Sequence, residues 1–225
     1  MPALADWLHE REFKLEIYTS LGNVTCSNGG RSYPIPGSEN YYQLDMDTFA
    51  SWNIDGVKGD WCGDVHDLPI DGLLVGAKDY KALAHALNNT TPHRPLYFEA
   101  VAAYIFLLGE TPNHVNAWRA QVIDHHDSWE NTLEVIALYE TAGIKGKPGA
   151  WAYCDVLMTG GAGCKAGIEY LNETSHCPGM TDEEYRTEFA FWWIVQSPLI
   201  VDTDVRFMTP IMNELLLNWK MIEIH

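Results

Sequence analysis

Five acidic residues each close a segment whose pattern predicts a β-strand. These residues are Asp60, Glu99, Asp124, Asp155 and Asp202. The strands of a (β/α)₈ barrel direct their carboxyl ends to one face, where the active site is built. Acids at the ends of successive strands therefore favour a ring of strands over an open, doubly wound sheet. Two such carboxylates suit cleavage of a glycosidic bond, because one can attack the anomeric carbon while the other protonates the leaving oxygen.

Large aromatic residues stand next to several of these predicted strand ends. They are Tyr18, Trp61, Trp118 and Trp151. An aromatic face beside the acids would suit the apolar face of a sugar ring. The alternative for each of them is burial in the hydrophobic core.

Two adjacent histidines suggest a metal site as the competing chemistry. His125 and His126 lie between Asp124 and Asp127. Successive residues on a strand point to opposite sides, so both histidines cannot easily reach one ion. The alternative for the two histidines is a solvated loop before a helix. The chain also lacks the glycine-rich motifs of nucleotide-binding proteins and the GxSxG motif of hydrolases. We therefore expect neither a metal nor a cofactor.

The elements that must position these residues alternate between strands and helices. The pattern predicts strands at residues 13–18, 55–60, 94–99, 120–124, 150–155 and 198–202. It predicts helices at residues 1–10, 42–52, 74–87, 128–141, 182–195 and 210–219. This alternation is typical of an α/β fold with a parallel sheet. About six strand–helix units predict a (β/α)₈ barrel that lacks its first two strands.

Local signals mark the helix ends and one long loop. Asp127 or Ser128 is the expected N-cap of one helix, which should stop at Gly143. Thr181 or Asp182 is expected to cap the next. Residues 160–179 are rich in glycine and predict a long loop.

The charge balance excludes several classes of partner. The chain has 14 basic and 31 acidic residues and a net charge of −17. We therefore expect neither nucleic acids nor anionic membranes as partners, because phosphate contacts need Lys and Arg. No apolar run reaches the length of a membrane span, and the first ten residues predict an amphipathic helix instead of a signal peptide.

Cysteines and glycosylation sequons indicate a secretory history. Four sequons begin at Asn23, Asn88, Asn89 and Asn172. The five cysteines lack the spacing of a zinc site, and their odd number leaves one unpaired within the chain. We expect Cys154 to be unpaired, because it lies inside a predicted strand. The preferred bridge in the long loop is Cys164–Cys177, with Cys154–Cys164 as the alternative.

Several segments, in the same order along the chain, resemble the α-galactosidase / α-N-acetylgalactosaminidase family, glycoside hydrolase family 27. Residues 57–62 are similar to its Lys-Phe-Asp-Gly-Cys motif, and residues 123–129 to its Asp-Ile-x-Asp-x-Trp motif. Further segments resemble its third strand, the helix after that strand, its seventh-strand motif and its last strand. They are residues 13–23, 41–52, 151–157 and 189–206.

The resemblance implies a role for each matching residue. Asp60 matches the nucleophile and Asp124 the general acid/base of a retaining enzyme, whose two carboxyls lie about 5–5.5 Å apart. Cys26 and Cys62 match a disulfide beside the nucleophile. Asn23 matches a glycosylation position.

Five further residues match positions that contact the sugar. They are Tyr18, Lys58, Glu99, Arg119 and Asp155. The charge of Lys58 would also favour an ionised Asp60. Family members with Glu at the position of Glu99 tend to accept a 2-hydroxyl, which favours galactose. The small residues 100–103 weaken the discrimination against N-acetylgalactosamine.

The chain departs from the family at three places. Tyr153 replaces the first Asp of the seventh-strand motif. No segment matches the adjacent aspartates that hold the galactose 4- and 6-hydroxyls, and none matches the C-terminal β domain. Residues 1–225 are therefore expected to form a partial catalytic barrel.

The implied activity is removal of terminal α-linked galactose from oligosaccharides or glycoconjugates. One alternative is an α-N-acetylgalactosaminidase. The other, of a different class, is a non-catalytic fragment with at most weak carbohydrate binding. The resemblance also implies a homodimer of the full-length protein and a secreted, lysosomal or vacuolar location.

Overall fold

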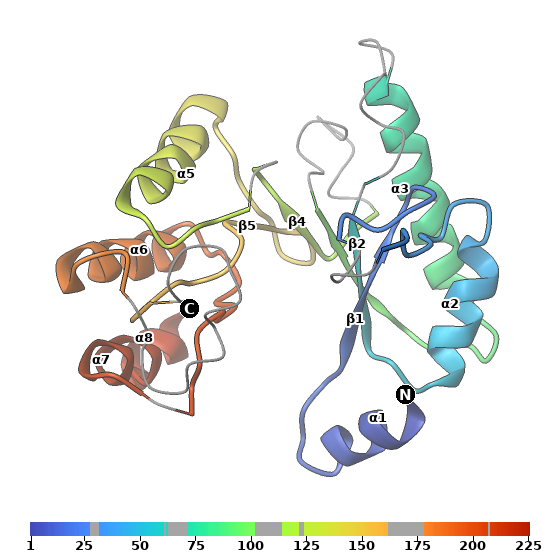
Figure 1. Cartoon of the computed structure of the whole chain (residues 1–225), viewed down its shortest axis with the longest axis horizontal. Coiled ribbons are helices and arrows are strands. Elements are labelled where there is room, and N and C mark those ends of the chain that lie inside the picture. The colour runs from blue at the N-terminus through green and yellow to red at the C-terminus, as the bar shows by residue number, and fades with distance from the viewer. Residues whose placement is uncertain are drawn as a thin grey trace. The chain divides into compact units, whose positions relative to one another are not determined.

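The computed structural model describes residues 1–27, 32–60, 62, 72–101, 114–121, 124–161, 178–206 and 208–225. The chain divides into two compact units, Met1–Val122 and Ile123–His225 (Figure 1). No helix in the described ranges is long and apolar enough to cross a membrane.

The described part of the first unit is built on four parallel strands that pair in chain order. They are β1 (Glu16–Ser20), β2 (Gly56–Asp60), β3 (Tyr97–Ala100) and β4 (Ala117–Arg119). The register places Tyr18 opposite Lys58, and Lys58 opposite Glu99. Because side chains at matched positions of paired strands share a face, these three lie side by side. Within this unit the described strands form an open sheet.

Helices α2 (Tyr42–Ser51) and α3 (Gly72–Asn88) pack together on one side of these strands (Figure 1). Gly59 allows the close approach of α3, because an added Cβ would lie 2.8 Å from the Phe98 ring and 3.0 Å from Leu83. Close packing against Phe98 and Leu83 therefore favours glycine at position 59, on the face of β2 opposite to the carboxylate of Asp60.

Helix α1 (Pro2–His9) is tied to the start of β2 through Asp55. The carboxylate of Asp55 contacts His9 Nε2 at 2.6 Å, Arg94 Nη2 at 2.6 Å and Lys14 Nζ at 3.3 Å. It also accepts a hydrogen bond from the backbone N of Leu15 at 2.9 Å. This cluster joins four segments of the first unit at the end of the strands opposite to Asp60.

Among its described residues, the second unit contains one short strand and four helices. They are α5 (Trp129–Ala142), β5 (Trp151–Tyr153), α6 (Asp182–Ile194), α7 (Pro210–Leu216) and α8 (Trp219–Ile224). Ser128 caps α5, and Gly143 ends it with a φ of 60°. Thr181 and Glu184 form a capping box at the start of α6. Ser128, Gly143 and Thr181 were all predicted from the sequence.

Three predicted elements differ from the structure. The strand expected at 120–124 lies instead at β4, where Asn116 Oδ1 accepts a hydrogen bond from Phe98 N. The strand expected at 198–202 is reduced to one parallel bridge between Val201 and Leu157. The helix expected at 210–219 is two helices, because the side chain of Asn218 caps α8. The predicted α/β class with parallel strands is confirmed for the described residues, whereas a closed ring is not shown.

Candidate active site

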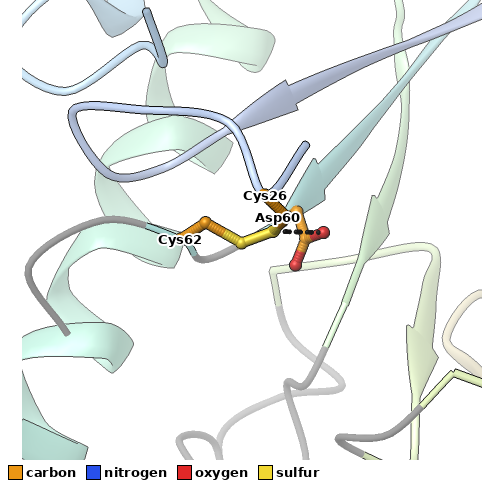
Figure 2. A group of neighbouring side chains, drawn as sticks. All are labelled: Cys26, Asp60 and Cys62. Atoms are coloured by element: carbon orange, nitrogen blue, oxygen red, sulfur yellow. Dashed lines mark hydrogen bonds between the residues drawn. A yellow bond between two sulfur atoms is a disulfide. The ribbon is translucent and has the colours of Figure 1, made fainter. Parts of the chain in front are cut away.

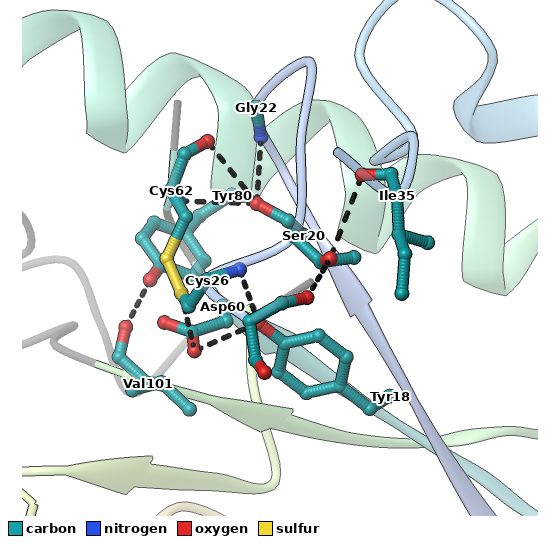
Figure 3. The surroundings of a disulfide bond; sticks show 11 residues. Tyr18, Ser20, Gly22, Cys26, Ile35, Asp60, Cys62, Tyr80 and Val101 are labelled. Atoms are coloured by element: carbon teal, nitrogen blue, oxygen red, sulfur yellow. Dashed lines mark hydrogen bonds between the residues drawn. A yellow bond between two sulfur atoms is a disulfide. The ribbon is translucent and has the colours of Figure 1, made fainter. Parts of the chain in front are cut away.

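Asp60 lies at the carboxyl end of β2, half-buried and held on one oxygen by residues from β1 and the loop after it. Tyr18 donates a hydrogen bond from its hydroxyl to Asp60 Oδ2 at 3.1 Å, and the backbone N of Cys26 donates to the Tyr18 hydroxyl at 3.3 Å (Figure 3). Cys26 Sγ is 2.9 Å from the same Asp60 oxygen (Figure 2). The orientation of this carboxylate is therefore set by a neighbouring strand as well as by β2.

The structure contains the disulfide Cys26–Cys62, with Cα atoms 5.1 Å apart. Buried Ser20, at the end of β1, accepts a hydrogen bond from Cys62 N at 3.0 Å and donates to Cys62 O at 3.3 Å (Figure 3). Cys26, Asp60 and Cys62 each offer one atom that could bind a metal ion. These three atoms lie within 4.8 Å of one another, a grouping that resembles a metal site. Because both sulfurs are bonded in the disulfide, neither is a thiolate, and the oxidised cluster cannot bind zinc through sulfur.

Lys58 and Glu99 form an ion pair beside Asp60. Lys58 Nζ is 3.3 Å from Glu99 Oε1, and Glu99 is buried. Lys58 precedes Asp60 by two residues on β2, so both side chains project from the same face of the strand. Tyr18 is 42% exposed on that face. The first unit thus brings together four of the predicted site residues: Tyr18, Lys58, Asp60 and Glu99.

Glu16 and Tyr80 are residues near this site that the sequence did not single out. Glu16 precedes Tyr18 by two residues on β1. Although the residue as a whole is exposed, desolvation of its carboxyl and the charge of Glu99 raise its pKa to about 8, against the opposing charge of Lys58. Tyr80 of α3 is fully buried and donates to the Val101 carbonyl. Burial and the charge of Asp60 raise the pKa of Tyr80, so its hydroxyl stays protonated. The sequence contained one indication for Glu16. It stands two residues before Tyr18, so on a β-strand the two side chains project from the same face.

The remaining predicted residue of this unit, Arg119, ends β4 and is buried. Its Nε donates to the carbonyl of Gln121 at 3.2 Å. Trp118 is also buried, so this aromatic belongs to the core and does not offer an exposed sugar face. Trp61 lies outside the described residues.

Asp124 and Asp155, the other two predicted residues, belong to the second unit. Asp124 is exposed, whereas Asp155 is buried and adopts a φ of 73°. Asp155 Oδ2 accepts a hydrogen bond from the backbone N of His125 at 2.8 Å. The backbone directly after Asp124 is therefore anchored by the loop that follows β5.

The prediction of a solvated loop at the two histidines is wrong for His125. His126 is exposed, but the side chain of His125 is fully buried against Glu188 of α6. Asp127, two residues further on, accepts hydrogen bonds from the Tyr185 hydroxyl at 2.7 Å and from Gly179 N at 2.9 Å. The segment after Asp124 is consequently held to α6 through Tyr185 and to the residues that precede α6 through Gly179.

The structure describes three of the five cysteines, the two of the disulfide and Cys154. Cys154 is buried and not disulfide-bonded, as the sequence predicted, and its N donates to Ser197 Oγ at 2.9 Å. Cys164 and Cys177 lie outside the described residues, so their pairing stays a prediction.

The sequence model of the family described as alpha galactosidase A matches residues 1–225. The chain belongs to this family of glycoside hydrolases.

Members of the alpha galactosidase A family are similar to the chain over its whole length. An α-galactosidase of Cyamopsis tetragonoloba is 29% identical over 231 residues, which cover 99% of this chain and 47% of the relative. An α-N-acetylgalactosaminidase of Gallus gallus is 32% identical over 241 residues, covering 99% and 50%. The crystal structure of a putative α-galactosidase from Bacteroides fragilis matches with a TM-score of 0.77 at 28% identity, covering 99% of this chain and 45% of that chain. The chain thus spans about half the length of the curated relatives it matches.

Proposed function

We propose that the protein containing this chain is a retaining α-galactosidase, with Asp60 as nucleophile and Asp124 as general acid/base. The arrangement of side chains around Asp60 supports this role, because the chain belongs to the alpha galactosidase A family. Its carboxylate is oriented by Tyr18, and Lys58 and Glu99 lie on the same face of the sheet. An oriented carboxylate beside polar groups that can bind sugar hydroxyls is what nucleophilic attack on a glycoside requires.

In the first step, the ionised carboxylate of Asp60 attacks the anomeric carbon of the terminal galactose. The bond from this carbon to the leaving oxygen breaks, and that oxygen takes the proton of Asp124. The products are a galactosyl ester on Asp60 and the free alcohol of the aglycone. Lys58 supports this step, because its positive charge favours the ionised form of a carboxylate nearby.

In the second step, a water molecule attacks the same carbon and gives its proton to Asp124. The ester bond to Asp60 breaks, which restores both carboxyl groups and releases galactose. Two inversions at one carbon give net retention. Proton NMR of the first product should therefore show α-galactose, and initial formation of β-galactose would overturn the double-displacement mechanism.

Asp60→Asn tests the nucleophile. The amide is nearly isosteric with the carboxylate but far less nucleophilic, so we expect turnover of p-nitrophenyl α-galactoside to be abolished while the fold is kept. The control is the circular dichroism spectrum and melting temperature of the variant against the wild type. Substantial activity in folded Asp60→Asn would exclude Asp60 as the nucleophile.

Asp124→Asn tests the acid. Substrates with poor leaving groups depend most on protonation, so their kcat should fall by about 10²–10⁴-fold, with a smaller loss for an activated aryl leaving group. Comparing alkyl and dinitrophenyl α-galactosides measures this difference. An equal loss on both would argue against an acid role.

The second candidate activity is that of an α-N-acetylgalactosaminidase. The relative from Gallus gallus with that name favours it, at 32% identity. Buried Glu99, next to Lys58, supports galactose instead, because family members with Glu at this position tend to accept a 2-hydroxyl. The ratio of kcat/KM for the two p-nitrophenyl sugars decides between them.

A non-catalytic carbohydrate-binding protein is the alternative of a different class. It would bind galactose in calorimetry without hydrolysing any aryl α-glycoside, and Asp60→Asn would then leave binding intact.

A further inference from the structure

The second unit contains a buried ionisable pair that the proposed mechanism does not use. His125 Nε2 is 3.1 Å from Glu188 Oε1, and both side chains have no solvent exposure. His125 directly follows Asp124, whereas Glu188 lies on α6, 63 residues further along the chain. The pair therefore links the residue next to the proposed proton donor to the interior of the unit.

Glu188 is surrounded by hydrogen-bond donors. Besides His125, it accepts hydrogen bonds from Met158 N at 2.9 Å and from Thr159 Oγ1 at 3.2 Å. Three donors converging on one buried carboxylate compensate for the loss of water around its charge. Removal of any one of them would leave part of that charge without compensation.

His125 is fixed through both its backbone and its ring. Its N donates to Asp155 Oδ2 at 2.8 Å, and its ring packs on Trp192 of α6 with ring centres 4.9 Å apart. Within the described part of the chain, Nδ1 has no hydrogen-bond partner. The tautomer with its proton on Nε2 fits this arrangement, because that proton is donated to Glu188 and Nδ1 carries only a lone pair.

We propose that His125 and Glu188 form a positioning pair that sets the place of Asp124, and this inference rests on the proposed function. Asp124 is exposed, and the residue after it is held at its N, its ring nitrogen and its ring face. The carboxyl of Asp124 is thereby presented from a segment that is anchored directly after it. Displacement of a catalytic group by about 1 Å can slow a reaction about 10²-fold.

Three substitutions at adjacent positions separate this role from general packing. His125→Leu fills much of the same space but removes the donor to Glu188. His125→Gln places an amide nitrogen where Nε2 stood, so it retains the donor. His126→Leu is the matched control, because the neighbouring histidine is exposed.

Leaving-group dependence is the first readout. His125→Leu should lower kcat on alkyl α-galactosides by about 10²-fold and on dinitrophenyl α-galactoside much less, because only the former needs a well-placed acid. His125→Gln should restore most of the loss, and His126→Leu should match the wild type. If His125→Leu slows both substrates equally, or if His125→Gln does not rescue, the pair does not position the acid.

Amide hydrogen exchange is the second readout and does not depend on turnover. His125→Leu should speed exchange at the amide of residue 125, whereas His125→Gln and His126→Leu should keep its protection. Unchanged protection in His125→Leu would overturn the positioning role. A wild type that hydrolyses no glycoside would instead overturn the proposed function, and hydrogen exchange would still decide whether the pair holds this segment.

Glu188→Gln covers the case in which His125→Leu does not fold. The amide keeps the size of the side chain and, at the place of Oε1, an acceptor for both Met158 N and His125 Nε2, but it removes the negative charge that faces His125. We expect the same dependence on the leaving group as for His125→Leu but a smaller loss, because a neutral amide oxygen accepts the proton of His125 less strongly than a carboxylate does. Wild-type kinetics in folded Glu188→Gln would also overturn the proposal.

Discussion

Asp55 shows how one carboxylate can join distant segments. Partial burial alone would raise the pKa of Asp55, but hydrogen bonds from His9, Leu15 N and Lys14 outweigh it and lower the pKa from 3.8 to about 2. A carboxyl whose pKa is lower in the folded state stabilises that state at pH values above its ordinary pKa. This contribution disappears as the pH falls through about 2.

Asp55→Asn should therefore reduce the free energy of unfolding near neutral pH by about 2 kcal/mol, the value of a shift of this size. The difference from the wild type should shrink as the pH falls from about 4 towards about 2. Urea unfolding at a series of pH values measures it. Glu10→Gln, on an exposed side chain of the same unit, is the control and should show no such dependence. A difference that is constant with pH would contradict the assignment.

The sequence distinguishes some single residues better than others. Asp60 and Glu99 could be placed together because each closes a predicted strand and parallel strands align these ends, whereas Lys58 was assigned only through the resemblance to the family. His125 and His126 carry the same local signal, yet one is buried and the other exposed. The difference comes from Glu188 on α6, and no local pattern predicts a partner so far along the chain.

Helix α6 carries both Glu188 and Trp192, so its start affects the segment at Asp124. The Thr181 side chain accepts from Glu184 N, and the Glu184 side chain accepts from Thr181 N at 2.7 Å. Thr181→Ala should lower the free energy of unfolding by about 1 kcal/mol, because it leaves a donor of the first turn without its partner. Thr187→Ala, at an exposed position within α6, is the matched control. Equal effects in urea unfolding would show that the cap does not stabilise the helix.

The disulfide Cys26–Cys62 connects the loop after β1 to the end of β2 across 36 residues. Reduction should lower the free energy of unfolding by about 4 kcal/mol through the greater entropy of the open unfolded chain. Denaturation with and without a dithiol measures the change. A Cys26→Ser, Cys62→Ser double variant should not respond at this site to the same reductant, and a response equal to that of the wild type would assign the effect to other cysteines.

Helix ends were predicted well, whereas short strands were not. Caps such as Ser128, Gly143 and Thr181 act through neighbours within one turn, so the sequence contains the whole interaction. Strand β4 has three residues, and its position depends on pairing with β3 and on Asn116. A hydrogen bond to a distant strand leaves no local periodicity, which is why this strand was placed three residues too late.

The whole molecule carries a net charge of −17, which should weaken the folded state through repulsion. Salt from about 0.01 M to about 0.15 M shortens the Debye length from about 30 to about 8 Å, so the melting temperature should rise over this range. Calorimetric scans measure it, and an uncharged osmolyte at equal osmolality is the control. A falling melting temperature would mean that screened ion pairs, such as those of Asp55, outweigh the repulsion.

Cys154 gives the second unit a natural reporter of its own opening. The thiol is buried, and burial raises its pKa to about 12, so almost no thiolate meets solvent while the unit is closed. Its alkylation rate under native conditions therefore measures how often that unit opens. Peptide mass spectrometry can follow the alkylation of Cys154 separately from that of the other cysteines, so no spectroscopic probe has to be attached. Ligands that bind the closed unit would then be recognised by a slower reaction at Cys154, whether or not they are substrates.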